Sequence, residues 1–211
     1  MKTIGKVEQQ SITPEKAIEL LRNGNARFVQ NLRYNRNLLQ QVNETADGQF
    51  PFATILSCID SRTTAELIFD QGLGDIFSIR IAGNVVNDDI LGSLEFAGGI
   101  AGSKLIVVLG HTNCGAIRGA CDHVDFGHLT GLLHKIQPAI QSENKFVSDR
   151  TGANLDFVNE VAKHNVKKSM DVIVDKSSIL RDLISQKKID LVGGIYDVST
   201  GEVIFFNRDR H

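Results

Sequence analysis

Short apolar runs alternate with amphipathic stretches along this chain, and the apolar runs predict β-strands. The clearest run is KLIVVLG at 104–110, whose nearly continuous apolar character is typical of a strand that is covered on both faces. Similar runs lie at 52–58, 76–82, 189–198 and 202–207. A turn at Ser199–Gly201 separates the last two runs, so we expect them to form an antiparallel hairpin.

The stretches between these runs have the spacing of helices. Thr13, followed by Pro14 and Glu15, marks a helix start, and apolar residues then recur at helical spacing to about Leu32. Further helices are expected at 65–71, 88–101, 116–141, 151–169 and 177–186. The polar, Asn-rich segment 33–49 is interpreted as a connector.

Strands that alternate with helices predict an α/β fold. We expect a mostly parallel central sheet flanked by helices, with an antiparallel edge strand at the end of the chain. A length of 211 residues is enough to bury one core without requiring two. The chain is therefore expected to form a single domain over 1–211, with an N-terminal helical arm at 1–35 and an α/β core at 52–211.

Charge and composition narrow the possible partners. The 23 Lys and Arg residues are balanced by 25 Asp and Glu, for a formal charge of −2, so neither nucleic acid nor a membrane is expected. No apolar run approaches the roughly 18 residues of a membrane-spanning helix. The N-terminus turns polar at once, unlike a signal peptide. We expect a cytoplasmic protein, or a periplasmic one if a leader has been removed.

Candidate metal chemistry lies at the ends of two predicted strands. Three cysteines, an odd number, favour metal or catalytic chemistry over a disulfide framework. Cys58 ends the strand at 52–58, and His111 and Cys114 follow the strand at 104–110. Because the carboxyl ends of strands in such sheets face one crevice, we expect the three residues to meet there. Thiolate and imidazole are the ligands that Zn²⁺ prefers, and its fourth position is left to Asp60 or to water.

An open fourth position would make this zinc catalytic. A water bound to such a zinc has its pKa lowered to about 7. Asp60 could accept the proton of the bound hydroxide and so aim its lone pair, while Arg62 could hold Asp60 by two hydrogen bonds. If Arg62 released it, Asp60 could ligate the metal and close the site.

Other interpretations stay open on these residues alone. In a non-catalytic zinc module, the metal would only fasten two loops, and Asp60 and Arg62 would be a surface ion pair worth about 0–1 kcal/mol. A nucleotide-binding module would need a complete phosphate loop, which neither Gly98–Gly99 nor Gly193–Gly194 forms. Co²⁺ or Fe²⁺ could occupy the same ligands. Cys121 is interpreted as an ordinary core residue.

Taken together, the motifs resemble the signature of the β-class carbonic anhydrases. They are Cys58-x-Asp60-x-Arg62, His111-x-x-Cys114, the run Arg80–Asn84 and the run Gly110–Ala116. The resemblance implies that Cys58, His111 and Cys114 bind zinc, and that Asp60 and Arg62 orient a zinc-bound hydroxide. The implied reaction is the reversible hydration of carbon dioxide to bicarbonate and a proton.

The same resemblance implies further roles and partners. Gln49 falls where plant-like members of the family carry a glutamine that hydrogen-bonds the substrate. Phe77 and Phe96 fall at the apolar wall of the carbon dioxide pocket, where Gly115 offers its backbone. The family forms homodimers, often paired into homotetramers, with active sites near the interface. A sister hydrolase of carbon disulfide or carbonyl sulfide would use the same metal site and stays an alternative.

Overall fold

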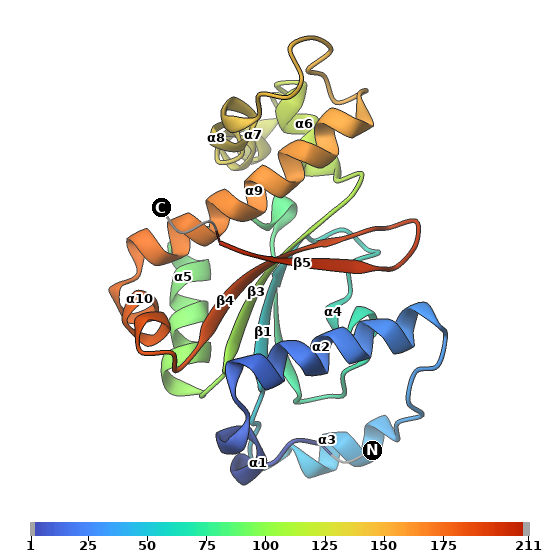
Figure 1. Ribbon diagram of the computed structural model, residues 1–211, viewed down its shortest axis with the longest axis vertical. Helices are drawn as coiled ribbons and strands as arrows, with labels where there is room; N and C mark the ends of the chain where they lie inside the picture. The colour runs from blue at the N-terminus through green and yellow to red at the C-terminus, as the bar shows by residue number, and fades with distance from the viewer. Residues whose placement is uncertain (1–2, 209–211) are drawn as a thin grey trace.

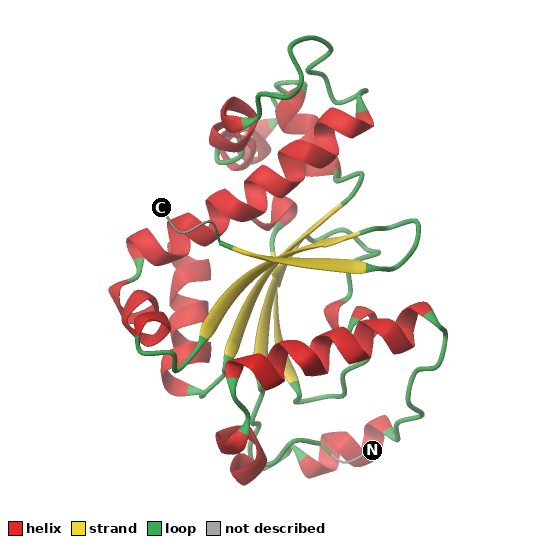
Figure 2. Ribbon diagram, viewed as in Figure 1, coloured by secondary structure: helices red, strands yellow, loops and turns green. Residues whose placement is uncertain are grey.

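The computed structural model describes residues 3–208, and a five-stranded sheet lies at its centre (Figures 1 and 2). The strands stand in the order β2-β1-β3-β4-β5. The first four are parallel, and β5 pairs antiparallel with β4 at the edge. Their bounds are β1 Ala53–Ser57, β2 Ile76–Arg80, β3 Leu105–His111, β4 Asp190–Tyr196 and β5 Val203–Asn207. The predicted α/β fold, with its parallel sheet and antiparallel edge strand, is confirmed.

Helices cover both faces of this sheet (Figure 1). The two long ones are α2 Pro14–Val29 and α9 Leu155–Lys176. The shorter ones are α1 Lys6–Ser11, α3 Leu38–Glu44, α4 Ala65–Ile68, α5 Asp88–Glu95, α6 Gly115–Cys121, α7 Gly127–His134, α8 Gln137–Ser142 and α10 Ser178–Ser185. A 3₁₀ turn at Ala82–Asn84 follows β2, and a π-helical turn at Phe96–Ile100 extends α5.

Side chains that alternate along β3 divide between two apolar clusters. Leu105, Val107 and Leu109 pack with α2 and α4 on one face. Ile106 and Val108 pack with α5, α9 and α10 on the other. All seven residues of β3 are buried, as its nearly continuous apolar sequence predicted. Burial of each large aliphatic side chain contributes about 1.5–3 kcal/mol to the stability of the fold, so the apolar residues of β3 together stabilise it strongly.

A third apolar cluster lies at the carboxyl end of the sheet. It joins α6 and α8 to the first half of α9, and includes the large side chains Ile117, Ile136 and Phe157. Cys58 and Cys114 belong to the same cluster. The carboxyl ends of β1 and β3 are therefore covered by apolar side chains instead of opening directly to solvent.

Two parts of the predicted helix pattern were wrong. The segment 33–49, predicted as a connector, contains α3, whose start is capped by the Asn37 side chain accepting a hydrogen bond from Gln40 N at 3.1 Å. The predicted helix at 116–141 is three helices, α6, α7 and α8. His123 (φ 53°) and Gly127 (φ 49°) have left-handed backbone conformations that a continuous helix does not allow.

Candidate metal centre

Two loops bring Cys58, His111 and Cys114 together at the carboxyl end of the sheet. Cys58 directly follows β1, His111 is the last residue of β3, and Cys114 is the N-cap of α6. Because β1 and β3 are parallel neighbours, their carboxyl ends lie side by side. One ligand atom from each of the three residues lies within 4.8 Å of the other two, and all three residues are buried. The predicted grouping is therefore present.

The imidazole of His111 is held in one orientation and one tautomer. Its Nδ1 lies 2.9 Å from the Thr112 carbonyl oxygen, which can only accept, so Nδ1 carries the proton. The other nitrogen, Nε2, is buried and has no hydrogen-bond partner among the described residues. A buried unpaired nitrogen is unfavourable unless a ligand satisfies it. A metal bound at Nε2 would do so, with Nδ1 making the usual supporting hydrogen bond.

The two thiols also suit a metal. Their sulfurs are 3.9 Å apart, too far for a disulfide and close to the ~3.8 Å between two thiolates on one tetrahedral zinc. The hydrogen bond with the Cys114 thiol, together with the nearby His111 ring and the Gly83 N–H, lowers the pKa of Cys58 to about 4. The hydrogen bond to that sulfur and burial raise the pKa of Cys114. A metal cation between two buried sulfurs this close would stabilise both as thiolates.

Asp60 lies beside this cluster but is held by Arg62. Arg62 Nε donates to Asp60 Oδ1 at 2.9 Å, and Arg62 Nη2 donates to Asp60 Oδ2 at 2.8 Å. These hydrogen bonds keep the pKa of Asp60 well below its usual range. Asp60 Oδ2 is 3.9 Å from His111 Nε2, so the carboxylate faces the cluster without belonging to it. Three residues are thus placed to bind a metal, with a carboxylate next to the remaining side.

The loop that carries Cys58 and Asp60 is fixed by residues to which sequence reasoning gave no role. Arg80 donates from Nε to the Cys58 carbonyl oxygen at 3.0 Å and from Nη2 to the Asp60 carbonyl oxygen at 2.6 Å. The Thr63 hydroxyl lies 3.0 Å and 2.8 Å from the same two oxygens. The sequence pointed to Arg80 only through the Arg80–Asn84 motif, and a motif does not reveal which atoms the side chain contacts.

Gly115 lies next to the cluster, and its role in binding substrate stays a prediction. It is the first residue of α6, directly after Cys114, and its exposed backbone has open space where a side chain would be. The three other residues predicted to bind substrate lie elsewhere within one chain.

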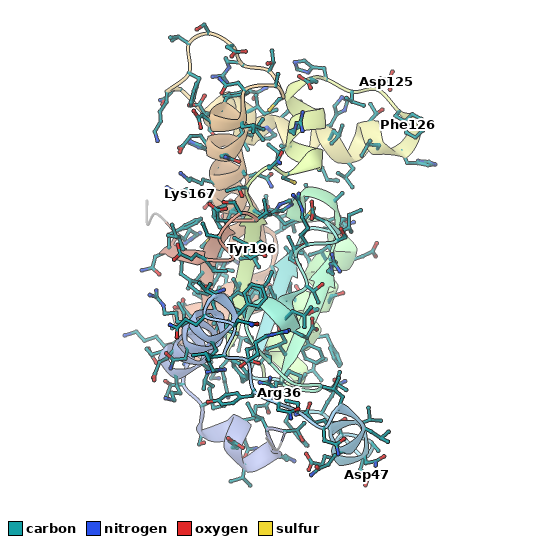
Figure 3. All side chains as sticks on the ribbon, turned by 90° about the vertical axis from the view of Figure 1, so that its right-hand side faces the viewer. Arg36, Asp47, Asp125, Phe126, Lys167 and Tyr196 are labelled. Atoms are coloured by element: carbon teal, nitrogen blue, oxygen red, sulfur yellow. The ribbon has the colours of Figure 1, made fainter. Side chains whose placement is uncertain are left out.

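Gln49 is exposed and precedes β1, whereas Cys58 follows it. Figure 3 shows Asp47, two residues before Gln49, at the end of the molecule opposite Asp125 and Phe126. Tyr196, the register partner of His111, lies about midway. Gln49 and Cys58 therefore lie at opposite ends of β1.

Phe77 and Phe96 contact each other, but they line a separate groove. Their ring centroids are 6.2 Å apart with the planes at 61°, an edge-to-face arrangement. The groove, of about 580 Å³, lies between the edge strand β2 and α5. Cys58, His111 and Cys114 are not among the residues that line it. The predicted wall of the carbon dioxide pocket is thus not built beside the metal residues by one chain.

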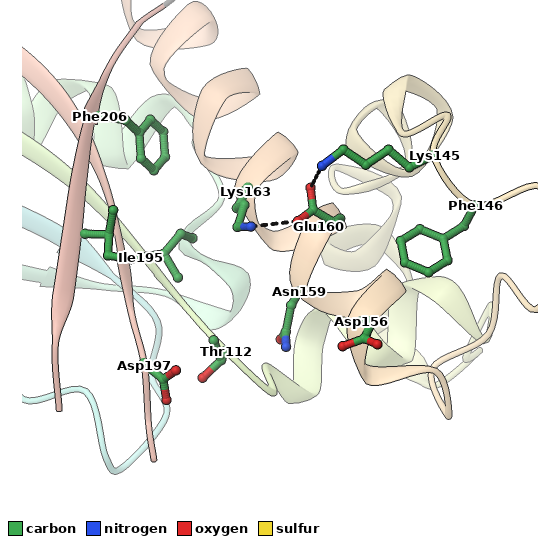
Figure 4. A pocket seen from close by; sticks show the side chains of 11 residues that line it. Thr112, Lys145, Phe146, Asp156, Asn159, Glu160, Lys163, Ile195, Asp197 and Phe206 are labelled. Carbon is green, nitrogen blue, oxygen red and sulfur yellow. Dashed lines mark hydrogen bonds and ion pairs between the residues drawn. The ribbon is translucent and has the colours of Figure 1, made fainter. Parts of the chain in front are cut away.

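A larger cavity, of about 660 Å³, lies behind the loop that follows β3 (Figure 4). It is bounded by α9, the β4–β5 hairpin and the residues after α8, and Thr112 and Asn159 form its boundary toward the metal loop. Asn159 Oδ1 accepts the Asn113 N–H at 2.9 Å, which fixes the turn between His111 and Cys114. Asn159 therefore holds this loop from the cavity side, whereas Cys58, His111 and Cys114 do not line the cavity.

The sheet and the Cys–His–Cys cluster define an α/β protein with a thiolate and imidazole metal site at the ends of its parallel strands. Comparison with known proteins gives the family. Residues 53–203 match the family model described as carbonic anhydrase. The chain is 34% identical over 199 residues to "Carbonic anhydrase 2" of Mycobacterium tuberculosis, covering 90% of this chain and 92% of that one. The chain belongs to the carbonic anhydrase family, in its β class, and is an enzyme of that family, whose reaction is the hydration of carbon dioxide.

Solved structures agree on the fold. The β-carbonic anhydrase CafA of Aspergillus fumigatus has a TM-score of 0.70 at 24% identity, covering 93% of this chain and 92% of its own. One of two tetrameric β-carbonic anhydrases of Sordaria macrospora has a TM-score of 0.67 at 23% identity, covering 76% and 83%. Among the described residues, no helix combines the length and the apolar character needed to cross a bilayer.

Proposed function

We propose that this enzyme hydrates carbon dioxide at a zinc ion bound by Cys58, His111 and Cys114, with Asp60 and Arg62 as the catalytic pair. The arrangement of Asp60 carries the proposal: it faces His111 Nε2 at 3.9 Å while Arg62 holds both of its oxygens. When bound, zinc would lower the pKa of a water molecule to about 7 and so supply a nucleophile at neutral pH.

Asp60 acts as an acceptor throughout this scheme. Its depressed pKa keeps the carboxylate ionised, so it accepts a proton in a hydrogen bond and does not donate one. An attacking oxygen whose proton points at Asp60 has its lone pair free for the carbon of carbon dioxide. The Arg62 guanidinium fixes the plane of the Asp60 carboxylate by two hydrogen bonds. This limits the directions from which a proton can approach the carboxylate oxygens. Together the two residues select one orientation of the nucleophile.

The same contacts argue against a purely structural metal. A structural zinc site commonly has four protein ligands. Here the described residues near the cluster offer three, and the fourth candidate, Asp60, is engaged by Arg62. If Arg62 were withdrawn, Asp60 would be free to bind the metal and exclude water, which is the closed state that we assign to it.

Gln49, Phe77 and Phe96 are proposed to bind substrate in a site shared between two copies of the chain. Within one chain β1 separates Gln49 from Cys58, and the two phenylalanines line an edge groove. Phe96 is 49% exposed, and β2 is an edge strand with no further strand beside it among the described residues. A second copy at this edge would cover the groove, and tetrameric relatives such as those of Sordaria macrospora support self-association.

The test is stopped-flow hydration of carbon dioxide on protein whose zinc content has been measured, with a chelated sample as the control. Rapid hydration that requires zinc, and that returns when zinc is added back, is expected. Fully zinc-loaded protein with no hydration would contradict the proposal, and carbon disulfide and carbonyl sulfide would then be assayed as substrates. Cobalt substitution would test how far zinc itself is required.

A further inference from the structure

The sulfur of Cys58 accepts a hydrogen bond from the backbone of a distant turn. Gly83 N lies 3.3 Å from Cys58 Sγ, in the 3₁₀ turn after β2. Gly83 has φ 65°, and a Cβ atom there would lie 3.0 Å from Ile136 Cδ1 and 3.3 Å from Ala116 Cβ. The position therefore requires glycine both for its backbone conformation and for space. Because glycine has no side chain that could pack or form hydrogen bonds, the position of this turn depends on contacts from other residues.

That support comes from two buried polar side chains of α9. Asn165 Nδ2 donates to the Gly83 carbonyl oxygen at 2.7 Å, and Ser169 Oγ donates to the Asn84 carbonyl oxygen at 3.2 Å. Asn165 and Ser169 are 2% and 5% exposed. They are four residues apart and so share one face of the helix. On this face the neighbouring buried residues are apolar: Val158, Val161, Ala162, Val166, Met170 and Ile173.

A polar amide in such an apolar face is unfavourable unless its hydrogen bonds are satisfied. The free energy lost by burying Asn165 is offset only while the Gly83 carbonyl is in place, and that carbonyl in turn depends on Asn165. The two groups therefore fix each other. Because Gly83 also carries the N–H that points at Cys58, the place of that donor depends on α9.

We propose that Asn165 is a positioning residue of the metal centre, which acts through Gly83 to keep a backbone N–H directed at the sulfur of Cys58. The inference rests on the proposed function, because it takes Cys58 to be a metal ligand. Ser169 anchors the same turn one residue further on, at Asn84, and has no hydrogen bond to the residue that contacts the sulfur. The two side chains thus differ in function although they share helix, face and burial.

Loss of the Asn165 amide should weaken metal binding. The Gly83 carbonyl would be left buried and unpaired, and the turn would shift to find another partner. The Gly83 N–H would then leave the sulfur, whose negative charge it stabilises in the metal-bound state. Removal of groups that support metal ligands lowers metal affinity by about 10–100-fold. We expect the Asn165→Leu variant, which is similar in size but has no donor, to lose about tenfold or more in zinc affinity.

The experiment compares wild type, Asn165→Leu and the matched control Ser169→Ala. Zinc affinity is measured by competition with a chromophoric chelator, and thermal unfolding of each metal-free protein reports stability. The absorption of the Co²⁺-loaded proteins supplies a third readout, because its sulfur-to-metal charge-transfer band responds to hydrogen bonds at the thiolate. Asn165→Ala, which has no polar side-chain group, replaces Asn165→Leu if that variant does not fold.

A positioning role requires that the Asn165 variant lose zinc affinity and shift the charge-transfer band, while Ser169→Ala keeps both at wild-type values. If both variants lower zinc affinity equally, in proportion to their loss of thermal stability, the role is only structural and the proposal is wrong. An Asn165 variant with wild-type affinity and spectrum would overturn it as well. Wild-type protein that binds no zinc would instead refute the proposed function, so the two failures are distinguishable.

Discussion

Arg62 holds both carboxylate oxygens of Asp60, at 2.9 Å and 2.8 Å, beside a cluster that contains only Cys58, His111 and Cys114 among residues 3–208. The two residues are separated by only Ser61, and Arg62 N also donates to Asp60 Oδ1, at 3.0 Å. The pair is therefore a local unit of the loop after β1. Its position is set by Arg80, which binds the carbonyl oxygens of Cys58 and Asp60.

Replacement of Asp60 by asparagine should separate metal binding from catalysis. Asp60→Asn keeps the three metal residues and the size of the side chain but loses the charge and one acceptor. We expect full zinc content and a loss of about 100-fold in kcat for carbon dioxide hydration. Asp156→Asn, at the separate cavity behind the ligand loop, is the control and should keep wild-type activity. A zinc-loaded, fully active Asp60→Asn would refute the role of Asp60.

The depressed pKa of Asp60 also gives an expectation for pH. Hydrogen bonds from Arg62 hold that pKa below its usual range, so the carboxylate stays charged as the pH falls through 7 and 6. A loss of activity between about pH 8.5 and 6.5 should therefore follow protonation of the nucleophile, with pKa near 7, and not of Asp60. A rate profile flat over this range would contradict the proposed nucleophile.

Single replacements of the metal residues should abolish zinc binding. Cys58→Ala and His111→Ala each leave two protein ligands, and we expect almost no bound zinc and the hydration rate of chelated wild type. Cys121→Ala is the matched control, because Cys121 is also a buried free cysteine but lies outside the cluster. Burial raises the pKa of Cys121 to about 11, so its thiol stays protonated. Loss of zinc from Cys121→Ala would mean that the ligand set is misassigned.

The grouping of Cys58, His111 and Cys114 was predictable because their position follows from strand ends. The apolar runs before Cys58 and His111 predict parallel strands, and parallel neighbours bring their carboxyl ends together whatever the rest of the chain does. No contact needs to be known in advance for that step. The tautomer of His111 and its unpaired Nε2, by contrast, depend on a backbone oxygen whose direction only the folded loop sets.

The side chains of Asn165 and Ser169, which hold the turn beside the site, could not be predicted from the sequence, and the reason is physical. Asn165 and Ser169 are polar residues in a helix, and sequence patterns place such residues in solvent. Here they face the core because the turn at Gly83 and Asn84 presents carbonyl groups to α9. Similarly, α3 was missed because its apolar residues are largely exposed: Leu39 is 72% and Val42 is 49% exposed. Its apolar face does not pack on the core, so its composition resembles that of a loop.

A buried ion cluster should make the segment between α2 and α3 important for stability. Asp70 is 2% exposed and has φ 45°; its carboxylate accepts hydrogen bonds from Arg27, at 2.6 Å, and from Arg36. Asp70→Asn would leave two guanidinium groups without their charge partner, and we expect a loss of about 3 kcal/mol in the free energy of unfolding at pH 7. Glu160→Gln, which breaks ion pairs to the exposed Lys145 and Lys163, should cost at most about 1 kcal/mol.

The effect of Asp70 should also depend on pH. Burial alone would raise its pKa, but the hydrogen bonds from Arg27 and Arg36 outweigh burial and lower it. A depressed pKa in the folded state stabilises the protein above the unfolded value of about 3.9, and this contribution disappears as the pH falls through the folded value. Urea denaturation of wild type and Asp70→Asn should thus give a gap that is constant from pH 7 to 5 and narrows below about 4. A gap that widens in acid would contradict the assignment.

Gln49 permits a direct test of whether the active site is shared between subunits. In a dimer of one Gln49→Ala chain and one Cys58→Ala chain, the first chain keeps its own metal residues and receives an intact Gln49 from its neighbour. Each variant alone should hydrate carbon dioxide slowly, whereas the two co-expressed chains, at equal levels and assembled at random, should recover about a quarter of the wild-type sites. Activity no greater than the average of the two parents would place Gln49 outside a shared site, and a fully active Gln49→Ala would remove it from the substrate site altogether.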